Sequence, residues 1–277
     1  MSKNMATVVG GQGFIGRALA NYLLTQGWNV FTPSKGENLT GKSLGYVFYC
    51  AGLTADYLKQ PNKTVDAHIS TLLSILQFSD YVGLVYLSST RLYDRINSQD
   101  SISEDTVFPI NPFEPRHFYD LTKLAGENLC YVLGKGKAKV ARLACVYDRA
   151  DMNSGFLPQL LWSVKHSNDN NSLSVASSPY FERDYVHLSD VLRSLVAIVT
   201  IGKYAVYNIA SGSNTSNTQL AEKIKQQTDI TIVFESNLKP KMTPVINVDR
   251  MINDLGVQPI SVFQGIELAL RDDYEYC

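Results

Sequence analysis

The 277-residue chain has little of what would place it outside the ordinary globular proteins. Its four cysteines include no Cys-x-x-Cys pair, which gives no support for a disulfide scaffold or a zinc site. No apolar run reaches the ~18 residues of a membrane-spanning helix, and residues 1–7 lack a signal-peptide core. Neither sign of charge is in excess: 25 Lys and Arg residues against 26 Asp and Glu residues give a net charge of 25 − 26 = −1. We therefore expect a cytoplasmic protein with no metal, membrane or nucleic-acid partner.

Short apolar runs alternate with segments of helical periodicity for most of the length, and near-continuous apolar strands are typical of a parallel sheet covered on both faces. The hydrophobic fraction of 45% excludes a disordered chain. The sequence thus predicts an α/β protein. We expect strands at 5–9, 28–32, 46–50, 84–87, 139–146 and 205–209, and helices at 14–26, 64–79, 118–133, 155–165, 188–200 and 218–227.

A glycine-rich turn joins the first expected strand to the first helix. Gly10 permits a tight turn, Gly13 lets the backbone approach a pyrophosphate, and Gly16 lets the helix pack on the strand. The pyrophosphate would then lie at the helix start, near the N–H groups of Phe14 and Ile15, where the helix dipole favours anions. Glycines also mark ordinary turns, but the strand before and the helix after favour dinucleotide binding.

This turn makes the predicted fold a Rossmann-type doubly wound sheet with a smaller C-terminal substrate-binding part. We expect residues 1–150 to form the dinucleotide-binding domain, with 184–210 returning to the sheet, and 151–183 and 211–277 to form the substrate-binding part. Only 46 − 33 = 13 steps separate Pro33 from Tyr46, which is fewer than the ~15 residues of a helix and a strand. One strand–helix unit is therefore predicted to be shortened after the second strand.

The second expected strand ends without the acidic residue that would bind the ribose hydroxyls of NAD. Ser34 and Lys35 follow it instead and could hold the 2′-phosphate of NADP. The alternative is that both residues lie in a solvated loop and the ribose is not contacted. We expect NADP in preference to NAD.

Tyr119 and Lys123 lie four residues apart, on one face of an expected helix. A cation beside a phenol lowers its pKa, so that the tyrosine can act as acid or base. Ser89 ends the fourth expected strand, at the sheet edge where ligands bind in such folds. The predicted catalytic set is Ser89, Tyr119 and Lys123, with Thr90 as a rival of Ser89.

Several segments together resemble the extended short-chain dehydrogenase/reductase family, in its nucleotide-sugar epimerase, dehydratase and reductase branch. The matches run from about residue 5 to residue 228. Besides the glycine turn and the Tyr-x-x-x-Lys pair, they are Cys50-Ala51-Gly52, Leu87-Ser88-Ser89-Thr90-Arg91-Leu92-Tyr93, Lys123-Leu124-x-x-Glu127, Arg142-Leu143-Ala144-Cys145-Val146-Tyr147, Arg183-Asp184-Tyr185-Val186-His187-Leu188-Ser189-Asp190-Val191 and Tyr207-Asn208-Ile209-Ala210.

The resemblance implies further roles. The cofactor would be lined by Cys50, Ala51, Gly52, Tyr119 and Lys123, and the nucleotide-sugar substrate would be contacted by Thr90, Phe156 and Arg183. The alternative for Arg183 is an ion pair with Asp184 or Asp190. His68 and Cys145 stand where the family usually has Asn, and we expect His68 to orient its neighbours rather than carry protons. Relatives pair helices 64–79 and 118–133 across a two-fold axis, which implies a homodimer.

These features predict an NAD(P)-dependent oxidoreductase of carbohydrate biosynthesis that reduces a nucleotide-linked 4-keto-6-deoxy sugar. Hydride would reach the keto carbon while Tyr119 protonates the oxygen, Ser89 polarises the carbonyl and Lys123 holds the cofactor ribose. The first alternative is a nucleotide-sugar 4-epimerase with tightly bound NAD, using the same residues. The remote alternative is a non-catalytic cofactor-sensing protein, which would have no need of an intact Ser–Tyr–Lys set.

Overall fold

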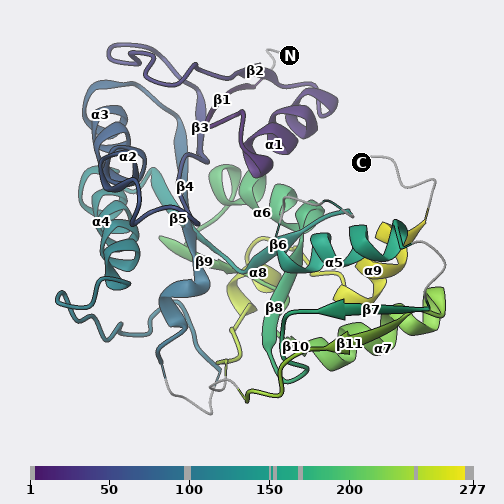
Figure 1. Cartoon of the computed structure of the whole chain (residues 1–277). Helices are drawn as coiled ribbons and strands as arrows, with labels where there is room; N and C mark the ends of the chain where they lie inside the picture. The colour runs from purple at the N-terminus through teal and green to yellow at the C-terminus, as the bar shows by residue number, and fades with distance from the viewer. Residues whose placement is uncertain are drawn as a thin grey trace.

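The computed structural model describes residues 4–96, 101–149, 151, 155–167, 171–239 and 243–271. Its centre is a six-stranded parallel sheet in the order β2-β1-β3-β4-β5-β9 (Figure 1). The predicted Rossmann-type fold is confirmed. The strands are β1 (Met5–Val9), β2 (Asn29–Phe31), β3 (Tyr46–Tyr49), β4 (Gly83–Ser89), β5 (Ala138–Leu143) and β9 (Val206–Ile209).

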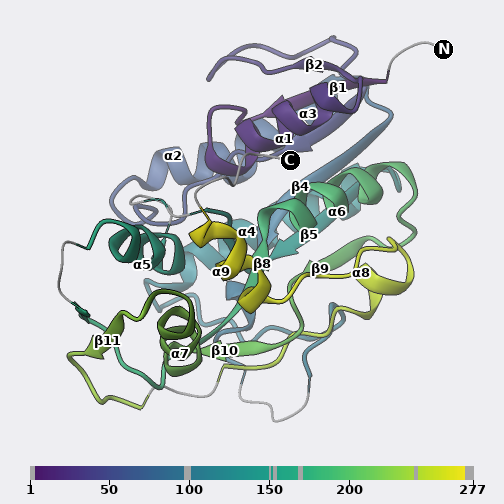
Figure 2. The same ribbon diagram turned by 90° about the vertical axis from the view of Figure 1, so that its right-hand side faces the viewer.

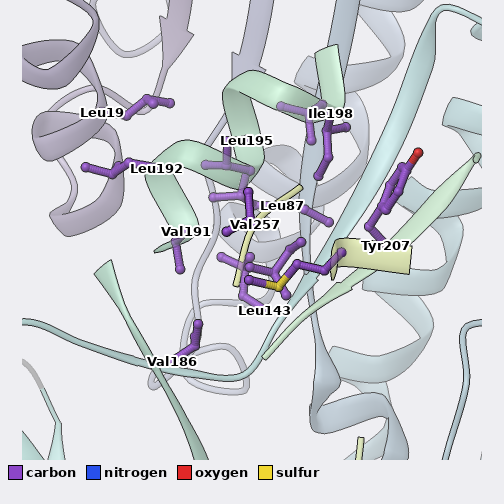
Figure 3. Close-up of a cluster of buried hydrophobic side chains, with 14 of the residues drawn as sticks. Leu19, Leu87, Leu143, Val186, Val191, Leu192, Leu195, Ile198, Tyr207 and Val257 are labelled. Atoms are coloured by element: carbon purple, nitrogen blue, oxygen red, sulfur yellow. The ribbon is translucent and has the colours of Figure 1, made fainter. Parts of the chain in front are cut away.

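Alternating side chains send the strands' apolar residues to both faces of the sheet. In β4, Val85 and Leu87 join the core cluster beneath α1 (Phe14–Thr25) and α6 (Leu188–Thr200), whereas Leu84 and Tyr86 join the cluster on the opposite face. Figure 3 shows side chains of α6 packed over Leu87 and the sheet. Helices therefore cover both faces, which explains why the strands read as continuous apolar runs.

A single helical stretch forms much of the second covering layer, together with α4 (His117–Leu133). It begins three residues before the expected Thr64, with α2 (Pro61–Val65), continues through one π-helical turn, η1 (Asp66–Ser70), and ends with α3 (Thr71–Phe78). Pro61 at the first helical position explains the earlier start, because its fixed φ suits a helix beginning and its missing N–H would have no partner there.

Residues 32–45, which the structure describes throughout, connect β2 to β3. They contain neither a helix nor another strand of a sheet. Both strands pair with β1, one on each side. The predicted shortening of one strand–helix unit after the second strand is thus confirmed. Gly45 makes this close return feasible, since its φ is +62° and a Cβ there would lie 2.3 Å from the Met5 carbonyl oxygen.

The prediction of one continuous strand over residues 139–146 is wrong, because two separate strands occupy this stretch. The chain leaves the central sheet after Leu143, where Ala144 N donates to Ile209 O, and β6 (Cys145–Tyr147) pairs with a different strand. That partner, β8 (Glu182–His187), also pairs with β10 (Asn214–Ser216) in a three-stranded sheet. The return of residues 184–210 to the central sheet therefore comes through α6 and β9, and not through β8.

The C-terminal part has a hydrophobic cluster of its own, away from β1 and β2 (Figure 2). The predicted helices at 155–165 and 218–227 are present as α5 and α7. The domain boundaries remain a prediction. The elements are α5 (Phe156–Lys165), β7 (Ser172–Val175), α7 (Asn217–Thr228), β11 (Thr231–Phe234), α8 (Asp249–Asn253) and α9 (Val262–Leu270). Among the described residues, no helix has both the length and the apolar character needed to cross a membrane.

Candidate active site

The glycine turn is closed by contacts that a side chain would disrupt. Gly10 has a φ of +83°, and a Cβ there would lie 2.8 Å from Ala51 N. A Cβ at Gly16 would lie 2.3 Å from Gly10 O. Only glycine at position 16 therefore lets the helix pack against the turn. Gly11 is also closely packed, because a Cβ added there would lie 2.8 Å from the Thr32 side chain. The sequence pattern did not single out Gly11.

The start of α1 suits an anion. Gly13 is its N-cap, no side chain caps the helix start, and its first turn contains no acidic residue. A Cβ at Gly13 would have as its one neighbour within 4 Å the Gly10 carbonyl oxygen, at 3.4 Å. The helix-start N–H groups of Phe14, Ile15 and Gly16 therefore suit a pyrophosphate. The residues present fit a dinucleotide.

The turn after β3 brings the predicted cofactor-lining residues to the predicted catalytic lysine. Cys50 N donates to Val9 O, which fixes Cys50, Ala51 and Gly52 beside the glycine turn. A Cβ at Gly52 would lie 3.2 Å from Lys123 Nζ and 3.3 Å from His68 Nε2. Glycine therefore keeps a space open beside Lys123.

The loop after β2 contains a carboxylate that sequence reasoning missed. Glu37 accepts a hydrogen bond from Ser34 N (2.9 Å) and forms an ion pair with Lys42 (2.8 Å). These two interactions, led by Lys42, lower the pKa of Glu37, so the carboxylate is ionised at neutral pH. The predicted phosphate-binding residues Ser34 and Lys35 thus share their loop with a negative charge.

Tyr119 and Lys123 lie in α4 and are both buried, with exposed fractions of 1% and 4%. Lys123 Nζ donates to Leu87 O (2.8 Å) and lies 4.9 Å from the Tyr86 ring centroid. Burial lowers the pKa of Lys123 to about 7. Burial also raises the pKa of Tyr119 to about 12, against the lowering effects of a Ser89 hydrogen bond and the Arg91 charge. In this structure the phenol is therefore protonated at neutral pH.

Ser89 ends β4 and caps the short helix η2 (Thr90–Tyr93) by accepting a hydrogen bond from Arg91 N at 3.1 Å. The Arg91 guanidinium lies against the Tyr119 ring, 4.9 Å from its centroid. Thr90 donates to Leu143 O, which ties it to β5. Ser89, and not Thr90, is thus the hydroxyl whose interaction lowers the pKa of Tyr119.

His68 is fully buried in the π turn and has both ring nitrogens engaged. Nε2 accepts from Leu53 N (3.2 Å), and Nδ1 contacts Thr122 Oγ1 (2.9 Å), whose own hydrogen goes to Tyr119 O. The bonds therefore assign the neutral Nδ1–H form. Burial, assisted by the charge of Lys123, lowers the pKa of His68 to about 3. These contacts support the predicted orienting role.

A cavity of about 390 Å³ lies next to Tyr119. Its lining has more cationic than anionic side chains. Ser89, Thr90, Tyr119 and Arg183 line it, but Phe156, in the described part of α5, is not in the lining and packs against the C-terminal cluster. Among the described residues, the lining consists of Thr54, Ser89, Thr90, Arg91, Tyr93, Asp94, Arg116, Tyr119, Leu143, Ala144, Cys145, Arg183, Asp184, Thr243, Pro244 and Ile246.

Arg183 lies over the Phe181 ring (4.2 Å) and forms neither of the ion pairs considered as its alternative role, within the described residues. Asp184 accepts from Ser211 N and Gly212 N, and Asp190 pairs with Arg193. Burial raises the pKa of Asp184 to about 6. The Arg183 charge at the cavity is therefore suited to an anionic part of a ligand. No group of three or more His, Cys, Asp or Glu side chains could hold a metal ion in the described chain.

A buried polar network lies behind the site. Glu127 of α4 accepts from Ser88 Oγ (2.5 Å) and pairs with Arg142 of β5, whose Nη1 donates to the Tyr93 hydroxyl (2.8 Å). Tyr93 in turn donates to Asn208 Oδ1 (2.8 Å). Four segments that carry the sequence resemblance thus meet in one network. Glu104, which sequence reasoning missed, joins it by accepting from Asn208 N (2.8 Å).

With this geometry established, the family can be assigned. The model of the family described as "NAD dependent epimerase/dehydratase family" matches residues 6–210, which include the glycine turn, Ser89, Tyr119 and Lys123. The chain belongs to this family. NAD dependent epimerases/dehydratases are enzymes, and the match ends within one residue of β9, the last strand of the central sheet.

Curated relatives of this family member are remote. UDP-glucuronic acid decarboxylase 1 of Xenopus tropicalis is 25% identical over 253 residues, and the chain spans 59% of its length while 79% of the chain is covered. The Arabidopsis thaliana protein of the same name is 24% identical, with 96% of the chain and 68% of the relative covered. These identities leave the reaction of this epimerase/dehydratase family member to be inferred from its own site.

Solved structures share the fold at still lower identity. UDP-N-acetylglucosamine 4-epimerase from Methanobrevibacter ruminantium has a TM-score of 0.79 at 17% identity, covering 99% of this chain and 98% of that one. UDP-glucose 4-epimerase from Thermotoga maritima gives 0.78 at 19%, with 97% of each chain covered. RMD from Pseudomonas aeruginosa, solved with NADPH, gives 0.76 at 22%, with 98% of each covered. The predicted α/β architecture thus extends over nearly the whole length.

Proposed function

We propose that this protein is an NAD(P)-dependent oxidoreductase that reduces a keto group of a nucleotide-linked 4-keto-6-deoxy sugar. The observation that carries the proposal is the Ser89–Tyr119 pair at the cavity, with the phenol protonated at neutral pH. Ketone reduction needs a proton donor at the oxygen, and a buried neutral phenol next to a serine hydroxyl is such a donor. The sugar would occupy the 390 Å³ cavity with its carbonyl oxygen toward both hydroxyls.

A bound reduced dinucleotide would supply the hydride in this chemistry and be oxidised by its loss. The Tyr119 proton would go to the carbonyl oxygen as that oxygen gains negative charge, so the ketone would become an alcohol. Ser89 donates to the same oxygen and stabilises the developing charge. Lys123, beside the space at Gly52, would hold the cofactor ribose. Arg183, at the cavity, would bind the substrate diphosphate.

The preference for NADP over NAD stays part of the proposal. Ser34 and Lys35 support it, while the Glu37 carboxylate on the same loop opposes a 2′-phosphate. Similar structures were solved with either cofactor: RMD with NADPH, and UDP-glucuronic acid 4-epimerase from Bacillus cereus with NAD. The proposed preference for NADP therefore depends on the balance of charge in this loop.

A second candidate is a nucleotide-sugar 4-epimerase with tightly bound NAD, favoured by the fold shared with two proteins described as 4-epimerases. The same three residues would move the proton at one sugar carbon, and the NAD would supply the hydride exchange that inverts its configuration. An assay of NADPH absorbance with nucleotide-linked 4-keto-6-deoxy sugars, and of product configuration with nucleotide hexoses, separates the two. Keto-sugar-dependent NADPH oxidation supports reduction. Inversion at C4 of a nucleotide hexose with no net NADPH oxidation replaces it with the epimerase.

A further inference from the structure

Arg91 lies against two tyrosines rather than against a carboxylate. Its guanidinium carbon is 4.9 Å from the Tyr119 ring centroid and 5.2 Å from that of Tyr57. Nη2 donates to the Tyr57 hydroxyl (3.3 Å), and the two rings contact each other with centroids 5.4 Å apart. Arg91 N also donates to Ser89 Oγ at 3.1 Å. One residue thus contacts the serine, the tyrosine and a neighbouring aromatic ring.

Lys123, the cation that the sequence pattern places beside the phenol, has other partners. Its Nζ donates to Leu87 O at 2.8 Å and lies over the Tyr86 ring. Burial lowers the pKa of this ammonium to about 7, so near neutral pH part of its charge is lost. A guanidinium, by contrast, stays charged over the whole working range.

We propose that Arg91 is a positioning residue that favours the ionised form of Tyr119 and holds Tyr57 against it. This rests on the proposed function, because Tyr119 must exchange a proton with the substrate oxygen. When the phenol gives up that proton, the phenolate remains next to the Arg91 charge. An opposite charge within ~4–6 Å favours the charged form of such a group. Lys123 then serves chiefly the cofactor side.

The other groups packed around Tyr119 differ from Arg91 in their charge. Ser89 from β4 presents a hydroxyl, His68 from η1 is neutral because burial lowers its pKa, and Tyr57 from the loop after β3 presents its ring. Asp120 from α4 raises the Tyr119 pKa, in the direction opposite to Arg91. Arg91 is therefore the permanent cation of this set.

The test is the pH profile of the reverse, oxidative reaction in Arg91→Met and Arg91→Lys. That direction needs the ionised phenol, so below the Tyr119 pKa of about 12 its rate rises about tenfold per pH unit, a limb that can be followed at moderately alkaline pH. Loss of the Arg91 charge raises that pKa, and we expect the rising limb in Arg91→Met to move up by ~1 pH unit. Arg91→Lys should keep the limb near its original place. Arg95→Met removes an exposed cation four residues away that contacts Glu114 instead, and should not move the limb.

Two outcomes would overturn the proposal that Arg91 is a positioning residue. A raised KM with an unmoved limb in Arg91→Met would make Arg91 a substrate contact and overturn the proposal. An unmoved limb in both Arg91→Met and Tyr57→Phe, with Tyr119→Phe inactive, would overturn it while leaving the proposed function intact. If Arg91→Met does not fold, Tyr57→Phe decides, because loss of the hydroxyl that accepts from Arg91 should shift the limb in the same direction by less. Ultraviolet titration of the phenol, with oxidised dinucleotide bound and with Tyr119→Phe as reference, gives a readout free of substrate.

Discussion

Lys123 donates a hydrogen bond from Nζ to the carbonyl oxygen of Leu87, 2.8 Å away, two residues before Ser89. This bond ties α4, which carries Tyr119, to β4, which carries Ser89. The exposed fraction of Lys123 is only 4%. The same side chain therefore fixes the relative position of two predicted catalytic elements and places a titrating ammonium within the core.

Lys123→Met should change how stability depends on pH. Burial lowers the pKa of Lys123 to about 7 in the folded protein, below its unfolded value of 10.5. Between these values the unfolded chain binds more protons, so this lysine makes the folded state more stable as pH rises through that window. The free energy of unfolding of the native protein should rise relative to Lys123→Met by at most ~1.4 kcal/mol per pH unit there. Urea denaturation of both proteins at pH 6, 8 and 10 measures it, and a constant difference would contradict it.

Removing the charge of one partner in the buried ion pair Glu127–Arg142 should lower the free energy of unfolding strongly. Glu127→Gln leaves the guanidinium of a side chain that is 5% exposed without its counter-charge, and such changes cost ~3–5 kcal/mol. Chemical denaturation of the variant measures the loss of unfolding free energy. Asp56→Asn, which breaks the exposed Asp56–Lys59 pair, is the control and should cost less than ~1 kcal/mol. Equal effects of the two variants would show that the network is not a stability element.

Cofactor preference should follow the charges in the loop after β2. NADPH is expected to bind more tightly than NADH, Lys35→Ala should narrow the gap, and Glu37→Gln should widen it by removing the carboxylate beside Ser34. Isothermal titration of the three proteins with each cofactor measures the ratio. Equal affinities in the unaltered protein, or a gap untouched by Lys35→Ala, would count against NADP.

A homodimer through the helices α3 and α4 remains predicted from the resemblance. On the outer face of α4, Leu121 and Val132 are 39% and 62% exposed and lie eleven residues apart, three helical turns along one stripe. The double variant Leu121→Glu/Val132→Glu should be monomeric by sedimentation at micromolar concentration. Leu24→Glu, at a leucine of α1 that is 57% exposed, should keep the dimer mass. A monomer mass for the unaltered protein would refute the prediction.

Local patterns predicted the central sheet well, because strands covered on both faces have continuous apolar sequence and the glycine turn has strict steric needs. They failed at Ala144, where an unbroken apolar run passes from one sheet to another and periodicity carries no sign of the change. They also missed Glu104, whose partner Asn208 is 104 residues away. In the sequence Arg91 stands out only as one residue of the segment 87–93 that resembles the family, since its contact with Tyr57 depends on a loop that has no regular pattern.

The central claim is that Tyr119 exchanges the proton with the substrate, and Tyr119→Phe tests it most directly. The change removes one hydroxyl and keeps the ring between Tyr57 and His68, so folding and cofactor affinity should survive. Loss of a positioned acid should lower turnover by ~10²–10⁴-fold. The measurement is the turnover number of Tyr119→Phe, with the substrate that the unaltered protein uses and with cofactor affinity measured alongside. A fall of that size with unchanged cofactor binding is the predicted result, and near-normal turnover would contradict the account.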